Sequence, residues 1–278
     1  MFTEEASGVF GVASRFVDGK NGIVVGERAA LAIDCSNYED EGQAMADFIR
    51  DKGFAPDRLV LTHGHGDHIW GGKPLKSGDV FAHHLTPGVM ERQVPQALKR
   101  REVSEEVIRS EMPWPTVTYR DELQIDLGGK TVWMFPSPGH SVDGVSVYVV
   151  EDKLLFSGDS VVTGIVAAIG DGDSRILEQS LHKLMKMDIE TLVPGHGETL
   201  HSKARVQDWL QWQAGYLASV RNRLQDELAA GKDAEAAAEA VDFETYIGDR
   251  LPIDRNGMPK RHRNTVDKIV EELATDNE

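Results

Sequence analysis

The strongest chemical signal in the chain is a run of seven residues, Thr62-His63-Gly64-His65-Gly66-Asp67-His68. Imidazole nitrogens and carboxylate oxygens are the ligands that zinc and similar divalent ions take in proteins. Residues 58–61 predict a short buried strand, so His63 and His65, two residues apart, point the same way from its end. The next glycine lets the backbone turn, and Asp67 and His68 can face elsewhere. The motif therefore suits two neighbouring ions, with the His pair on one and the Asp-His pair on the other.

Three further segments each place one potential ligand directly after a glycine that follows a strand-like run. The ligands are His140, Asp159 and His196. Loops at strand ends are where layered α/β folds carry their chemistry. A single His or Asp after a glycine is more often a turn residue. Four such segments in matching context make coincidence a poor explanation, so we predict that their side chains converge.

In this set of residues the chain resembles the metallo-β-lactamase superfamily, over roughly residues 8–200. The resemblance implies that one metal ion is held by His63, His65 and His140, the other by Asp67, His68 and His196, and that Asp159 bridges both. The β-lactamases of the family usually carry Cys or Ser at the position of Asp159. The glyoxalase II-like and lactonase-like branches carry Asp there, so the resemblance favours that branch over a dedicated β-lactamase.

Strand and helix signals alternate along the first two thirds of the chain, which periodicity alone would assign to an α/β or α+β fold. The resemblance implies more, an αββα sandwich over residues 1–201. Within it, strands are predicted over 8–35, with turns at 19–22 and 26–27, and helices over 41–52 and 174–187.

After Leu200 the strand signals vanish, and helices are predicted over 203–230, 234–241 and 265–274. We therefore expect residues 202–278 to be a helical segment that either covers the cleft or packs on the catalytic domain. A homodimer built on these helices is the alternative role.

Composition limits the cellular context and the partners. The formal charge of −16 disfavours a nucleic-acid partner, because phosphate binding needs a basic surface. No apolar run approaches the roughly 18 residues of a membrane span, and the acidic N-terminus does not resemble a secretory signal. The single cysteine, Cys35, follows a strand-like run and is expected to be a buried, inert thiol. These features favour a cytoplasmic enzyme that acts on a small molecule.

The chemistry expected of two adjacent divalent ions is hydrolysis. A bridging water is acidified to hydroxide near neutral pH and attacks an electrophilic carbonyl or phosphoryl centre. Asp67 would be a ligand and could also orient the water or accept a proton. Zinc suits the ligand set best, and iron or manganese would fit the same mixture. We predict cleavage of a carboxylic ester, lactone or thioester.

The sequence leaves three alternatives open. The hydrolase could cleave a β-lactam, phosphodiester or sulfate ester instead. A mononuclear-iron oxidoreductase is the second, because persulfide dioxygenase-like relatives bind iron through ligands of the His63, His140 and Asp159 type. The third is a metal-binding protein without turnover.

The sequence gives weaker evidence for substrate-binding residues than for metal ligands. Trp70 is the best aromatic candidate, because it lies two residues past His68. The run Lys260-Arg261-His262-Arg263 is a basic cluster in an acidic chain. It could receive a substrate carboxylate, but pairing with nearby acidic surface is the expected role.

Overall fold

The computed structural model describes residues 1–248, 250–251 and 257–275. Within them, the first sheet has seven strands in the order β1 to β7, and the second has six in the order β13-β12-β11-β10-β9-β8. The strands of the first sheet are β1 (Phe2–Ala6), β2 (Val9–Ala13), β3 (Lys20–Val25), β4 (Ala30–Ile33), β5 (Arg58–Val60), β6 (Asp79–His83) and β7 (Val117–Tyr119). Those of the second are β8 (Leu123–Asp126), β9 (Thr131–Pro136), β10 (Val145–Val149), β11 (Leu154–Phe156), β12 (Thr191–Val193) and β13 (Leu200–His201).

In the inner strands of both sheets, such as β3, β4, β10 and β11, successive side chains face opposite sides and are buried on both. In β3, Ile23 packs against the helices outside the first sheet, while Val24 packs between the sheets. In β11, Leu154 lies between the sheets, and Leu155 faces the helices outside the second sheet. This alternation explains the continuous apolar runs of the sequence. Three cores result, one between the sheets and one under each helical layer, as in the predicted αββα sandwich.

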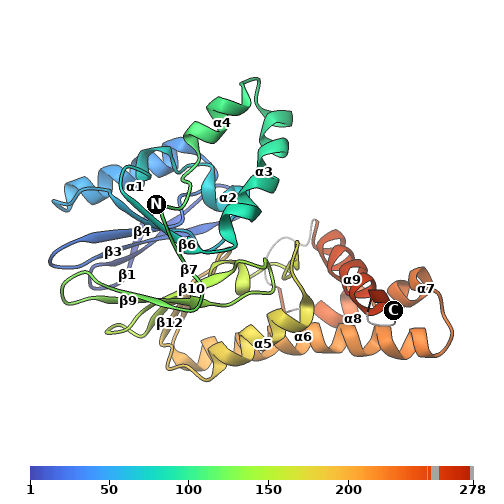
Figure 1. Cartoon of the computed structure of the whole chain (residues 1–278). Helices are drawn as coiled ribbons and strands as arrows, with labels where there is room; N and C mark the ends of the chain where they lie inside the picture. Colours follow the sequence, from blue (N-terminus) through green and yellow to red (C-terminus); the bar gives the residue numbers. More distant parts are fainter. Residues whose placement is uncertain (249, 252–256, 276–278) are drawn as a thin grey trace.

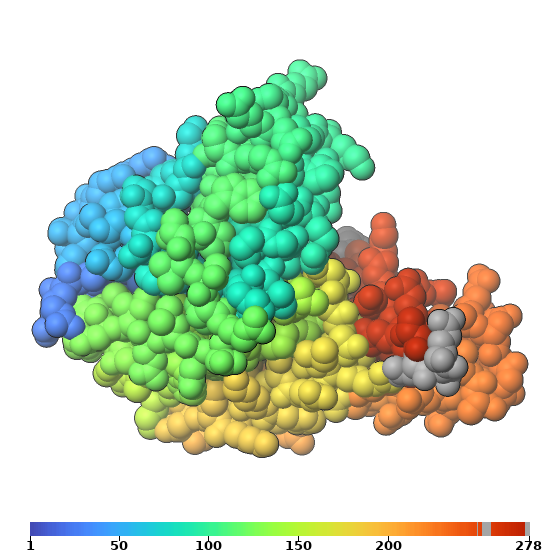
Figure 2. All heavy atoms as spheres, viewed as in Figure 1, coloured from blue at the N-terminus to red at the C-terminus, as the bar shows by residue number. Residues whose placement is uncertain are grey.

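Helices cover the outer face of each sheet (Figure 1). The first sheet is covered by α1 (Glu39–Asp51), α2 (Gly66–Ile69), η1 (Lys73–Leu75), α3 (Thr86–Arg100) and α4 (Glu105–Glu111). The second is covered by α5 (Ser174–Met185) and α6 (Lys203–Ala229), and η2 (Gly158–Ser160) follows β11. Helices α7 (Ala234–Glu239), α8 (Phe243–Ile247) and α9 (Met258–Thr275) pack on α6 and extend the core under the second sheet. From the side drawn in Figure 2, a notch separates α3 and α4 from the C-terminal helices.

The predicted turn at 19–22 is wrong, because residues 20–22 belong to β3 and pair with β2. Gly22 is needed there for packing: a Cβ atom on it would lie 2.5 Å from the ring of Phe156, which crosses from the second sheet. The last helix, predicted over 265–274, begins at Met258. Division of the chain at residue 201 into two domains stays a prediction.

Candidate metal centre

The predicted ligands lie at one edge of the sandwich, on loops that follow strands of both sheets. His63 and His65 follow β5 of the first sheet, and Asp67 and His68 lie on the short helix α2. From the second sheet come three more, after β9, β11 and β12 respectively: His140, Asp159 and His196. Strands β9, β11 and β12 run in the same direction, so their carboxyl ends meet at the same edge. The fold thus brings together side chains 133 positions apart in the sequence, from His63 to His196.

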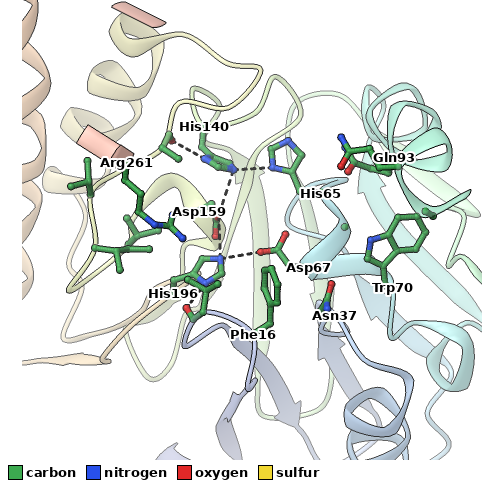
Figure 3. A pocket seen from close by; sticks show the side chains of 18 of the residues that line it. Phe16, Asn37, His65, Asp67, Trp70, Gln93, His140, Asp159, His196 and Arg261 are labelled. Carbon is green, nitrogen blue, oxygen red and sulfur yellow. Dashed lines mark hydrogen bonds and ion pairs between the residues drawn. The ribbon is translucent and has the colours of Figure 1, made fainter. Parts of the chain in front are cut away.

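The structure gathers all seven predicted ligands into one cluster (Figure 3 shows five of them). Two groups of three match the sets that the resemblance assigns to one ion each: His63, His65 and His140, and Asp67, His68 and His196. Within each group the candidate ligand atoms lie within 4.8 Å of one another. A third group of His63, His68 and Asp159 links these two.

Asp159 lies at the centre of the cluster, with its two carboxylate oxygens facing different imidazoles. Oδ1 is 3.3 Å from Nε2 of His68, and Oδ2 is 3.4 Å from Nε2 of His140 and 3.5 Å from Nε2 of His196. A Cβ atom on Gly195 would lie 1.9 Å from Oδ1 of Asp159, so only glycine permits this placement. The carboxylate therefore faces both groups of three, as a bridging ligand would.

Several buried polar atoms of the ligand set lack hydrogen-bond partners, as expected of atoms that bind divalent ions. Nε2 of His63, Nε2 of His68 and Oδ1 of Asp159 are buried and, among the described residues, have no hydrogen-bond partner. Although Nε2 of His68 and Oδ1 of Asp159 are 3.3 Å apart, they are not aligned for a hydrogen bond. Unpartnered buried polar atoms are costly in a native protein. Ligands about 2.1 Å from a tetrahedral ion lie roughly 3.4 Å apart, which is close to these separations.

The second nitrogen of each histidine is held by another group of the protein. Nδ1 of His68 contacts Oδ2 of Asp34 at 2.8 Å, and Nε2 of His65 contacts Oδ1 of Asp171 at 3.1 Å. Backbone carbonyls and one hydroxyl hold Nδ1 of the others: Ala168 O for His140, Val17 O for His196 and Thr62 Oγ1 for His63. Such contacts fix the ring orientation and point the opposite nitrogen into the cluster, where Nδ1 of His65 and Nε2 of His140 lie 2.9 Å apart.

Asp34, which directly follows the central strand β4, connects this strand to the ligand loop after β5. Its carboxylate accepts hydrogen bonds from N and Oγ1 of Thr62, both at 2.7 Å, besides its contact with His68. The residue is buried and has a φ of +55°. Asp143 supports the same loop from the second sheet by accepting a hydrogen bond from N of Gly64 at 2.9 Å. Neither residue belongs to the set predicted from the sequence.

Charge and burial compete in setting the pKa values of this cluster. Burial lowers the pKa of His63 well below its usual range. For His68, burial also acts to lower the pKa, but the charges of Asp159 and Asp34 outweigh it and raise the pKa well above the usual value. Burial acts to raise the pKa of Asp67, but its contact with His196 prevails and lowers the pKa to about 2. Burial acts in the same way on Asp159, but the charges of His196 and His68 prevail and lower its pKa well below the usual value. Asp67 and Asp159 are therefore both ionised at neutral pH, the state in which carboxylates bind metal.

A cleft of about 320 Å³ opens on the cluster. The ligands His65, Asp67, His140, Asp159 and His196 form its floor. Trp70, the predicted substrate-binding residue, lies on its wall, as do Gln93 of α3 and the apolar residues Val162, Ile165 and Val166. Arg261 of α9 also lines the cleft, which corrects the expectation that its basic cluster would pair with nearby acidic surface.

The other members of that cluster have different surroundings. Arg263 pairs with Asp267 on the surface of α9 at 2.6 Å, as expected. His262 is buried and contacts the hydroxyl of Tyr216 and the carbonyl of Val241.

The single cysteine, Cys35, is buried, as predicted.

The chain belongs to the metallo-beta-lactamase superfamily, whose family model matches residues 16–196. It is 26% identical over 148 residues to a beta-lactamase-like protein 2 homolog of Caenorhabditis elegans, a match that covers 51% of this chain and 42% of the relative. It is 22% identical over 220 residues to a hydroxyacylglutathione hydrolase of Cereibacter sphaeroides, covering 73% of this chain and 78% of the relative.

A third curated relative is the atrochrysone carboxyl ACP thioesterase of Aspergillus fumigatus, 25% identical over 216 residues, with 76% of this chain and 62% of the relative covered. Two of these three matches span less than two thirds of the relative. Among solved structures, a metallo-beta-lactamase family protein of Thermus thermophilus superposes with a TM-score of 0.66 at 16% identity, covering 98% of this chain and 94% of that one. That likeness shows the fold, and the hydrolase names of the relatives agree with a metal-dependent hydrolase. In the described part of the chain, no helix has both the length and the apolar character of a membrane span.

Proposed function

We propose that this protein is a dinuclear metal-dependent hydrolase that cleaves a carboxylic thioester, ester or lactone. The observation that carries the proposal is the convergence of the seven side chains, with three buried ligand atoms left without a hydrogen-bond partner among the described residues. The names of the hydroxyacylglutathione hydrolase and the thioesterase support acyl-bond cleavage over the other bonds considered. Zinc is the metal we propose, because the donors are imidazole nitrogens and carboxylate oxygens.

The residues of the chain have distinct roles in such a reaction. His63, His65 and His140 would hold one ion, Asp67, His68 and His196 the other, and Asp159 would face both. When bound, a divalent pair supplies an acidified water as nucleophile and polarises the substrate carbonyl. Asp67 lies in the floor of the cleft, where its carboxylate can accept a hydrogen bond from the attacking water and orient it. Its low pKa makes it a ligand and orienting group rather than a strong base.

The test combines metal content with a substrate panel. Protein reconstituted with zinc should hold about two ions per chain, and it should hydrolyse one or more of a thioester, an ester and a lactone. β-Lactam, phosphodiester and sulfate-ester substrates form the comparison arm, and oxygen uptake with a persulfide tests the oxidoreductase alternative. One iron per chain together with oxygen uptake would refute the proposal. Turnover confined to the comparison arm would refute its acyl-substrate part.

A matched pair of histidine variants ties activity to the cluster. His196→Ala removes a ligand that lies 3.3 Å from Asp67 and 3.5 Å from Asp159. We expect loss of one ion and a fall in kcat/KM of at least about a hundred-fold, because a ligand of the pair is gone. His182→Ala on the exposed face of α5 should change neither quantity. Unchanged turnover in His196→Ala would remove the second metal from the mechanism.

A further inference from the structure

The charged residues that line the cleft differ from those of the rest of the chain. The whole sequence has 46 acidic and 30 basic residues. Among the described residues that line the cleft, the carboxylates are Asp67 and Asp159, both in the proposed ligand set. Two guanidinium groups, those of Arg100 and Arg261, line the same cleft. Once metal ions neutralise the two carboxylates, the cleft is cationic in an otherwise acidic protein.

The two arginines come from different layers of the fold. Arg100 is the last residue of α3, outside the first sheet, and Arg261 lies in the first turn of α9, on the helices of the second sheet. Figure 3 shows Arg261 on the side of the ligands opposite to Gln93 and Trp70, with its side chain reaching toward Asp159. A substrate lying across the ligands would therefore meet Arg261 on one side and the α3 wall on the other.

Neither guanidinium has an ion-pair partner among the described residues, in contrast to the neighbouring arginine of each. Arg101 pairs with Glu111 at 2.6 Å, and Arg263 pairs with Asp267 at 2.6 Å. Arg261 is half-buried beside the apolar side chains that line the cleft. Placing a cation in such a position costs free energy unless an anion or hydrogen-bond acceptor joins it. The planar guanidinium is suited to a carboxylate or a phosphate, which it can bind through two parallel hydrogen bonds.

We propose that the substrate of this hydrolase carries an anionic group, a carboxylate or a phosphate, and that Arg261, assisted by Arg100, binds that group. The inference rests on the proposed acyl-bond hydrolysis and narrows its substrate class. Val162, Ile165 and Val166 provide an apolar surface beside Arg261 for the carbon chain between the anionic group and the scissile bond. A neutral acyl compound of the same length would leave the guanidinium unpaired and would bind less well.

Thioesters that differ in one group test this selection on the zinc-loaded protein. S-pentanoyl and S-glutaryl N-acetylcysteamine differ by a methyl against a carboxylate. S-pentanoyl pantetheine and its 4′-phosphate differ by a phosphate on the 4′-hydroxyl of the leaving group. We expect kcat/KM to favour the charged member of one pair by roughly ten-fold or more, and that pair identifies the anion. Equal rates within both pairs would overturn the inference while leaving the hydrolase proposal intact.

Matched arginine variants then locate the selection. Arg261→Gln should reduce the preference for the anionic substrate by roughly ten- to a hundred-fold, with neutral substrates changed by less than about three-fold. Arg100→Gln tests the opposite wall and should act in the same direction. Arg263→Gln, on the same helix but paired at the surface, should leave the preference unchanged. A preference that survives in both Arg261→Gln and Arg100→Gln would overturn the assignment.

Binding without turnover separates this inference from the proposed function. Pentanoate and glutarate can each meet the metal ions through one carboxylate, but only glutarate has a second for Arg261. Calorimetry on the zinc-loaded protein should show that Arg261→Gln weakens glutarate or inorganic phosphate by roughly ten-fold and leaves pentanoate unchanged. That result in a protein that hydrolyses no thioester, ester or lactone would refute the proposed function and support the anion site. Hydrolysis with no effect of Arg261→Gln on any ligand would refute the anion site alone.

Discussion

Replacing Asp34 with Asn should weaken metal binding although Asp34 itself is not a proposed ligand. Its Oδ1 accepts a hydrogen bond from N of Thr62, and its Oδ2 contacts both Oγ1 of Thr62 and Nδ1 of His68. Asparagine keeps the size and also tolerates the φ of +55°. However, an amide offers one accepting oxygen and one NH₂ donor where the carboxylate offered two acceptors.

The consequence depends on which way the new amide faces. If its NH₂ group faces Thr62 N, two donors oppose each other in a buried site. If the NH₂ group faces His68, Nδ1 must accept, and the proton moves to Nε2, the atom that faces Asp159. A protonated Nε2 cannot bind a metal ion. Either outcome should lower zinc affinity by roughly ten- to a hundred-fold and stability by about 1–3 kcal/mol.

Two measurements check this reasoning separately. Competition with a chromophoric chelator gives the zinc affinity, and urea unfolding of the metal-free protein gives the stability. Asp40→Asn, which removes a carboxylate charge from an exposed ion pair with Arg15, is the matched control and should change neither by much. Zinc affinity within two-fold of the wild type in Asp34→Asn would show that the contact with His68 does not fix its tautomer.

Three further predictions concern stability. Burial lowers the pKa of His262, so the unfolded chain takes up the proton first as the pH falls. The stability that His262 contributes above about pH 6.5 should therefore be lost progressively below that pH. The drop in Tm between pH 7.5 and 5.5 should be smaller in His262→Gln than in the wild type, and unchanged in the control His201→Gln. Gly42→Ala would place a Cβ 2.0 Å from the carbonyl oxygen of Gly71 and should lower the free energy of unfolding in urea by about 1–3 kcal/mol. Gly215 lies in α6, where a Cβ would meet no neighbouring atom within 4 Å, so Gly215→Ala should raise that free energy by about 0.5–1 kcal/mol. A similar response of both variants would contradict the packing argument. Removing metal with a chelator should lower Tm, by an amount equivalent to about 2.7 kcal/mol when free zinc had been a hundred times its Kd, and an unchanged Tm would argue against bound metal in the folded protein.

Much of the fold could be predicted because its signals are local. Buried strands bounded by glycine, and helices with one apolar face, are determined by short stretches of sequence. Accordingly, β5, α1 and α5 lie within a few residues of their predicted bounds. The Lys20-Asn21-Gly22 run could not be assigned this way. It has the composition of a turn, but Gly22 lies in a strand because the ring of Phe156 from the other sheet fills the space of a side chain. Packing between sheets is not a local property of the sequence.

The site shows the same division between local and distant information. Its proposed ligands could be named because four share one short motif and the other three, His140, Asp159 and His196, each follow a strand and a glycine. The resemblance supplied their grouping. Asp34 also follows a strand, but it stands alone and has no glycine before it. The helix predicted over 265–274 leaves out Arg261, although Met258-Pro259 carries a start signal, because proline is favoured in the first helical turn. Its position in the cleft depends on how α9 packs on α6, which no short pattern records.

The separation of the ligand loops from α9 has a consequence for how such a protein can diverge. The loops that hold the candidate ligands extend from strands whose inner faces share one core, whereas α9 belongs to a different core together with α5 and α6. Substitutions near the start of α9 can therefore alter which molecules are accepted while the catalytic apparatus keeps its shape. Descendants of one ancestral chain can therefore acquire new substrate specificities through substitutions in α9 alone, without first passing through an inactive intermediate.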